Sequence, residues 1–122
     1  MVEDRLTDAT RIGQLLASEL TGRESAPFDV ISVVDADRSA EPSPDGTKAY
    51  GIAIDGDRVG TVRLYPGRVT VRFTVGVDRA ASAADGPGLS ARQDGDAVVL
   101  SVESGAAVKR ATDAVGAAVA PE

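Results

Sequence analysis

The residues best suited to bind a ligand by charge are three arginines and a tyrosine in a predicted β-hairpin. Arg63, Tyr65, Arg68 and Arg72 flank the turn-forming pair Pro66-Gly67. If that pair is a two-residue turn, or part of a longer loop of the same parity, residues 65/68, 64/69, 62/71 and 60/73 pair and share faces of the sheet. The three arginines and the tyrosine then lie on one face. Guanidinium groups bind carboxylates or phosphates through paired hydrogen bonds, and a tyrosine ring offers a stacking surface.

The residue types on which most enzymes depend are missing from the chain. It has no cysteine and no histidine, so it lacks a thiolate nucleophile, a cysteine-based zinc site, a Ser-His-Asp triad and the usual general base. Gly86-Pro87-Gly88 has no following Lys-Ser/Thr and precedes a predicted strand, so it fits neither phosphate-binding glycine motif. We therefore expect no catalytic residue and no cofactor. A small enzyme that uses carboxylates or arginines remains a second alternative.

An acidic segment, residues 35–46, is the candidate for metal binding. Its carboxylates are Asp35, Asp37, Glu41 and Asp45, and Ca²⁺ prefers several oxygen ligands from one loop. Aligned with an EF-hand loop that starts at Asp35, the segment has alanine at the sixth position and glycine at the twelfth. The template needs glycine and a bidentate glutamate there. We therefore predict a solvated loop and no metal site.

The charge balance limits the choice of partner. Nineteen acids and thirteen bases give a net charge of −6, which repels phosphate backbones at long range and makes nucleic acid an unlikely partner. Of the bases only Lys48 and Lys109 are lysines, and aspartate outnumbers glutamate. This composition is typical of salt-loving archaea, or else of a bacterium with GC-biased codon usage. No apolar run reaches the roughly 18 residues of a membrane span, and the N-terminus is acidic, so we expect a cytoplasmic protein without membrane contact.

The hydrophobic pattern predicts one α+β domain over residues 1–122. A helix from Thr7 to Thr21 carries Ile12, Leu16 and Leu20 on one face and is capped by Thr7. A short helix is expected within residues 77–85, and Ser104 can cap a final helix. Strands are predicted at residues 28–34, 49–54, 59–65, 69–75, 89–92 and 97–102. The expected fold is a single antiparallel sheet of about six strands flanked by N- and C-terminal helices, in the order α-β-β-β-β-(short α)-β-β-α.

Two of the predicted turns decide which side chains share a face. A two-residue turn within residues 55–57 would place Ile52 and Ile54 on the face of Arg63, whereas an odd-length loop or a bulge would align them with Val62 and Leu64. We predict the odd-length loop, because one buried face is then continuous. In the last hairpin, a turn at Asp94-Gly95 would set residues 89 and 91 beside residues 100 and 98.

Three stretches carry a resemblance to known sequences. Residues 5–19, the run Asp55-Gly56-Asp57-Arg58-Val59 and residues 102–109 resemble a family of small uncharacterised haloarchaeal proteins, a domain of unknown function. The resemblance spans most of the chain, but its motifs are a helix face, a turn and a cap. It implies an intracellular compartment and adaptation to salt, and it implies no activity.

The sequence leaves two classes of function open. The first is a non-enzymatic protein-interaction module, which binds a protein partner or forms a homodimer through a sheet face or edge. The second binds nucleic acid or another anionic ligand through the face of Arg63, Arg68 and Arg72. If acids of the same molecule neutralise these arginines, the face is instead ordinary solvated sheet.

Overall fold

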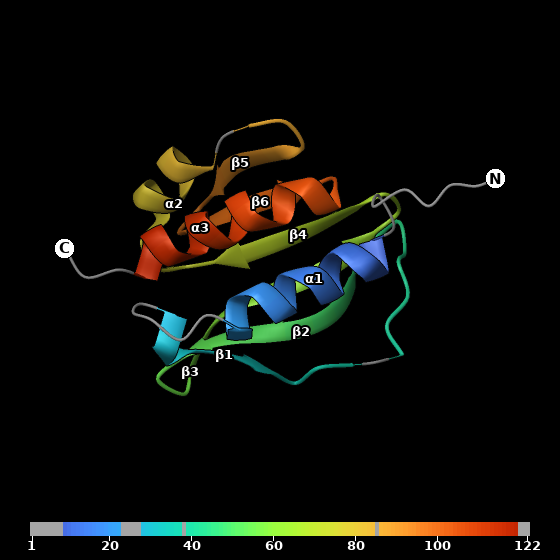
Figure 1. Cartoon of the computed structure of the whole chain (residues 1–122), viewed down its shortest axis with the longest axis horizontal. Helices are drawn as coiled ribbons and strands as arrows, with labels where there is room; N and C mark the ends of the chain where they lie inside the picture. The colour runs from blue at the N-terminus through green and yellow to red at the C-terminus, as the bar shows by residue number, and fades with distance from the viewer. Residues whose placement is uncertain (1–8, 23–27, 38, 85, 120–122) are drawn as a thin grey trace.

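The computed structural model describes residues 9–22, 28–37, 39–84 and 86–119 (Figure 1). Its elements follow the predicted order, with a short 3-10 turn before the first strand and another before the last helix. They are α1 (Ala9–Gly22), η1 (Phe28–Val30), β1 (Ile31–Val34), β2 (Thr47–Ile54), β3 (Asp57–Tyr65), β4 (Arg68–Phe73), α2 (Val77–Ala83), β5 (Leu89–Asp94), β6 (Ala97–Val102), η2 (Gly105–Ala107) and α3 (Val108–Val119). The α+β class predicted from the sequence is confirmed.

The described strands form one antiparallel sheet in the order β1-β2-β3-β4-β6-β5. The chain leaves β4 through α2 and returns as β5 at the edge, so that β6 comes back to pair with β4. Figure 1 shows α1 and α3 side by side on one face of this sheet. No helix of the described residues covers the opposite face, which we call the outer face.

The core lies between the helices and the inner face of the sheet. Ile12, Leu16 and Leu20 of α1 have no exposed surface, as the helical spacing predicts. Thr7, the predicted cap, lies outside the described residues. Helix α3 adds a stripe of small residues, among them Ala111 and Val115, that allows it to pack closely beside α1.

The hairpin of β3 and β4 has the predicted register. The pairs Tyr65↔Arg68, Leu64↔Val69, Val62↔Val71 and Gly60↔Phe73 all form. Val62, Leu64, Val69 and Val71 are buried on the inner face, so the alternate residues of both strands point to the outer face.

The turn between β2 and β3 differs from the predicted odd-length loop. It is a two-residue turn in which Asp55 and Gly56 both have positive φ, 52° and 86°, the geometry of a type I′ hairpin turn. A bulge at Val59 changes the parity, since Ala53 pairs with Arg58 and Ile52 with Gly60. Ile52 and Ile54 therefore face the core as predicted, but the bulge in β3, and not an odd-length loop, places them there.

Two other local predictions are also corrected. Residues 28–30 form a 3-10 turn where a strand was predicted. There the Phe28 ring packs against Gly116 of α3, where a Cβ would come within 2.5 Å of it. In the last hairpin the pairs are Leu89↔Val102 and Ala91↔Leu100, two residues from the predicted register. The turn residues are Gly95 and Asp96, and a shift of two leaves every side chain on its predicted face.

Candidate docking surface

The outer face of the sheet carries basic side chains from four strands. Arg63 and Arg72 lie opposite Thr70 and Thr61, and Tyr65 lies opposite Arg68. The four predicted residues are thus on one face, as the hairpin register requires. The described residues add three more cations to this face, which we call the basic sheet face. Its cations are Lys48 of β2, Arg58 and Arg63 of β3, Arg68 and Arg72 of β4, and Arg92 of β5.

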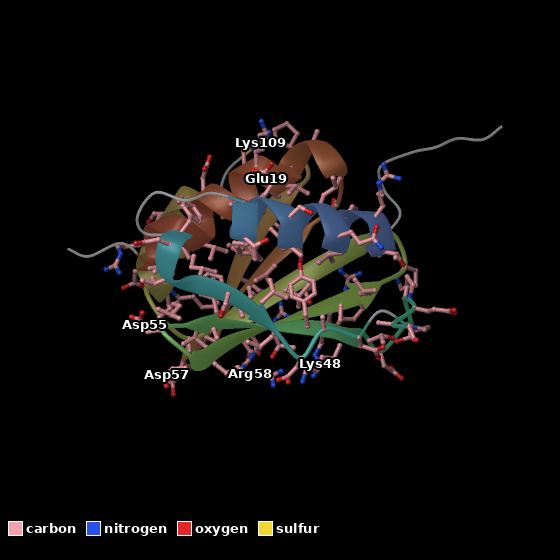
Figure 2. The ribbon with its side chains drawn as sticks, turned by 60° about the horizontal axis from the view of Figure 1, so that its bottom comes forward. Glu19, Lys48, Asp55, Asp57, Arg58 and Lys109 are labelled. Carbon is pink, nitrogen blue, oxygen red and sulfur yellow. The ribbon has the colours of Figure 1, made fainter. Side chains whose placement is uncertain are left out.

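The sequence prediction does not include Lys48, Arg58 and Arg92. The position of each of them on this face depends on how its strand pairs with the neighbouring strands. Lys48 pairs with Arg63 next to a second irregularity of β2, and Arg58 reaches the outer face through the bulge at Val59. Figure 2 shows Lys48 and Arg58 on the side of the sheet away from the helices. Arg72 and Arg92 both pair with Val99, one from each side. Their backbones are therefore two strand spacings apart, roughly 10 Å.

The floor between these cations consists of small side chains. Gly51, Thr61, Thr70, Val99 and Ser101 alternate with buried core positions on β2, β3, β4 and β6. Thr70 and Val99 are only 8% and 6% exposed, although no described helix covers them. The aliphatic stems of neighbouring arginines can shield such residues while the charged ends stay in water. The outer face is therefore a surface of small, partly polar side chains from which the guanidinium groups project.

Carboxylates neutralise only part of this charge. Arg58 donates to Asp35, with 2.9 Å between Nη1 and Oδ2, and Arg72 Nε lies 3.8 Å from Asp94 Oδ2. Among the described residues, no carboxylate lies within ion-pair distance of Lys48, Arg63, Arg68 or Arg92. The face therefore presents unneutralised positive charge on a chain whose net charge is −6.

Tyr65 has a different environment from the stacking surface suggested by the sequence. Its ring lies against Gly46, where a Cβ would come within 2.5 Å of Cζ. The Arg68 guanidinium lies 4.4 Å from the ring centroid, a cation–π contact. Tyr65 therefore positions Arg68 on the face, and its ring is already in contact with two neighbours.

The acidic segment after β1 contributes structure at this site. Asp35, with φ of 54°, aims its carboxylate at Arg58. The Asp37 carboxylate accepts a hydrogen bond from the backbone N–H of Ser39, at 2.9 Å, which closes a local turn. Within the part of the chain that the structure describes, no three carboxylates gather closely enough to hold a metal ion.

The chain can be placed among known proteins at the level of a family. None of the described helices has the length and apolar character needed to cross a membrane. No curated protein and no solved structure shows a significant match to the sequence. A family of unknown function, DUF7993, matches residues 1–122. The chain belongs to this family.

Proposed function

We propose that the chain is a non-enzymatic binding module that docks an acidic segment of a partner protein on the basic sheet face. The observation that carries the proposal is the set of cations from four strands on a face that no described helix covers. Four of them, Lys48, Arg63, Arg68 and Arg92, have no carboxylate partner among the described residues.

The chemistry of the face favours carboxylates. Guanidinium groups can bind a carboxylate through two parallel hydrogen bonds. The hydroxyls of Thr61, Thr70 and Ser101 lie on the same face and can donate to the oxygens that remain. A short acidic segment that lies across the strands would bring its side chains over successive cations. Such a contact gains more from electrostatic complementarity than from buried apolar area.

Nucleic acid fits this face less well. Proteins that bind single strands stack bases on open aromatic rings. On the described outer face the aromatic residue is Tyr65, whose ring already contacts Gly46 and Arg68. The net charge of −6 also opposes the approach of a phosphate backbone more strongly than that of a few carboxylates.

A second copy of the chain is also a poor occupant of the face. A two-fold axis would place the same patch of each copy against the other. The cations at Arg63, Arg68 and Arg92, which have no carboxylate partner among the described residues, would then lie against the same positively charged patch of the other copy. A homodimer through this face is therefore disfavoured by like-charge repulsion.

The proposal is tested with a labelled peptide of alternating glutamate and glycine, followed by fluorescence anisotropy. The face variant is Arg63→Ser/Arg92→Ser. The matched control is Arg11→Ser/Lys109→Ser, which removes two exposed cations from α1 and α3 and changes the net charge equally. We expect the wild type and the control to bind the peptide alike, and the face variant to bind about two- to thirtyfold more weakly, as two exposed ion pairs allow. Far-UV circular dichroism confirms that each variant is folded.

Two results would overturn the proposal. One is an equal loss of binding in the control variant, which would assign the effect to net charge alone. The other is tighter binding of a single-stranded oligonucleotide than of the peptide at the same salt concentration. That second result would favour the nucleic-acid alternative.

A further inference from the structure

A cavity lies on the other side of the sheet from the basic face. It has a volume of about 350 Å³ and is bounded by α1, by β1 and by the segment that joins β1 to β2. The floor is formed by Tyr50 and Leu64, two residues of the inner face. Figure 1 shows that the connecting segment passes beside α1 on its way to β2. This volume falls at the lower end of the range for small-molecule sites in proteins.

Small residues keep this cavity open. Gly13 and Ala17 of α1, Ala36 and Ala40 of the connecting segment, and Ala49 of β2 all line it. A larger aliphatic side chain at any of these positions would occupy part of the space. Gln14, Ala36 and Asp37 of the lining are exposed, so the cavity is open to solvent and a ligand can enter it from the surface.

The walls of the cavity are held in place. The backbone N–H of Asp37 donates to the Ala49 carbonyl at 2.8 Å, which fastens the connecting segment to β2. The Tyr50 hydroxyl donates to the Gly13 carbonyl at 2.8 Å, which fastens α1 to the same strand. All four residues that these two hydrogen bonds join line the cavity. The site is therefore formed before any ligand enters.

Four polar side chains line the cavity, those of Thr10, Gln14, Asp37 and Tyr50. The Tyr50 hydroxyl hydrogen is used by Gly13, so its oxygen can only accept from a ligand. The Asp37 carboxylate accepts one hydrogen bond from Ser39 and has no cation partner among the described residues. Gln14 adds an amide at the rim. Thr10 adds a hydroxyl, and the other lining side chains are hydrocarbon.

We infer that this cavity binds a small organic amine, with its apolar body among the alanines and its ammonium group at Asp37. The apolar body would displace water from the alkyl walls. The N–H groups of the ammonium would donate hydrogen bonds to the Asp37 carboxylate and to the Tyr50 hydroxyl oxygen. This site is separate from the basic sheet face, so the two proposals can fail independently.

Three probes with the same hydrocarbon chain separate the contributions of body and head group. They are hexylammonium, hexanol and hexanoate, each titrated into ¹⁵N-labelled protein and followed by amide chemical shifts. We expect hexylammonium to bind best, hexanol less well and hexanoate least. The shifted amides should belong to α1 and to residues 36–40 and 49–50. Shifts confined to the outer face, or binding in the opposite order, would overturn the inference.

Two variants and a control test the residues. Asp37→Asn should weaken hexylammonium about two- to fivefold, the range for an exposed ion pair, and should leave hexanol unchanged. Asp45→Asn removes a carboxylate from the same segment that does not line the cavity and should change neither probe. Ala40→Leu should abolish binding of both. If Ala40→Leu is unfolded by circular dichroism, Gln14→Trp fills the cavity from an exposed helix position. Unchanged binding of both probes in a folded filling variant would refute the site.

Discussion

Arg58 lies directly over Gly51 of the neighbouring strand. A Cβ on Gly51 would stand 2.8 Å from Arg58 Nε and 3.1 Å from the Val34 side chain. The missing side chain at Gly51 thus allows the Arg58 stem to lie flat on the outer face, from which its guanidinium reaches Asp35. This pair joins the loop after β1 to the second and third strands.

We expect Gly51→Ala to displace the flexible, partly exposed Arg58 side chain and to destabilise the protein by up to about 1 kcal/mol, the range for a lost exposed ion pair. The control is Gly22→Ala. A Cβ at Gly22 meets nothing within 4 Å, so alanine there should be neutral or stabilise α1 by up to about 1 kcal/mol. Urea unfolding measures both. Equal stability of the two variants would show that Arg58 moves aside without cost.

Leu16 tests the packing of α1 on the sheet. Its side chain has no exposed surface, so Leu16→Ala should lower the free energy of unfolding by about 2–5 kcal/mol through lost burial and a residual cavity. Ser18→Ala, at an exposed position of the same helix, should change it by less than about 0.5 kcal/mol. A loss below about 0.5 kcal/mol for Leu16→Ala would contradict its place in the core.

The predictions from sequence were most reliable where periodicity and burial point the same way. The α1 face and the β3–β4 register follow from apolar spacing, because a shift of one residue would expose Val62 and Val71. The bulge at Val59 was harder to locate. A bulge and an odd-length loop place the same side chains on the same face of the sheet. The hydrophobic pattern of the sequence indicates only which side chains share a face, so it does not distinguish the two.

The candidate site was predictable in part for the same reason. Arg63, Tyr65, Arg68 and Arg72 belong to one local hairpin, so their common face follows from a single turn. Lys48 and Arg58 belong to strands whose register depends on bulges. Arg92 joins the face because β6 pairs with β4 and with β5, a strand order that no local pattern predicts. The contact of Tyr65 with Gly46 joins a strand to a distant part of the acidic segment, and no local pattern predicts such a contact.

Tyr50 should make the protein less stable in alkali. Burial raises the pKa of Tyr50 well above its ordinary value of about 10. Below that ordinary value both folded and unfolded states keep the proton, so its contribution is fully present. Above it the unfolded chain loses the proton while the folded chain keeps it, and stability falls by up to about 1.4 kcal/mol per pH unit.

Tyr50→Phe isolates this effect. The variant loses the hydrogen bond to Gly13 and should be about 0.5–1.5 kcal/mol less stable at neutral pH. Its stability should then fall less steeply than that of the wild type above about pH 10. Urea unfolding of both proteins on either side of that pH provides the comparison. Parallel curves would mean that Tyr50 ionises as readily in the folded protein as in the unfolded chain.

Salt should stabilise the protein. The net charge of −6 implies repulsion among the acids at low ionic strength, and molar KCl reduces the screening length to about 3 Å. We therefore expect the melting temperature to rise between low and molar KCl. A flat or falling melting temperature would contradict adaptation to salt.

The Arg63→Ser/Arg92→Ser variant shows which charges dominate this salt response. It raises the net negative charge and at the same time removes two cations of the basic sheet face that lack a carboxylate partner among the described residues. If repulsion among the acids dominates, the variant gains more from KCl than the wild type does, and this is the result we expect. If repulsion within the basic sheet face dominates, the variant gains less. Melting curves of both proteins across one KCl series distinguish the two, with Arg11→Ser/Lys109→Ser as the control of equal net charge. A smaller gain in the face variant alone would contradict this expectation and would show that repulsion among the guanidinium groups of the basic sheet face destabilises the fold.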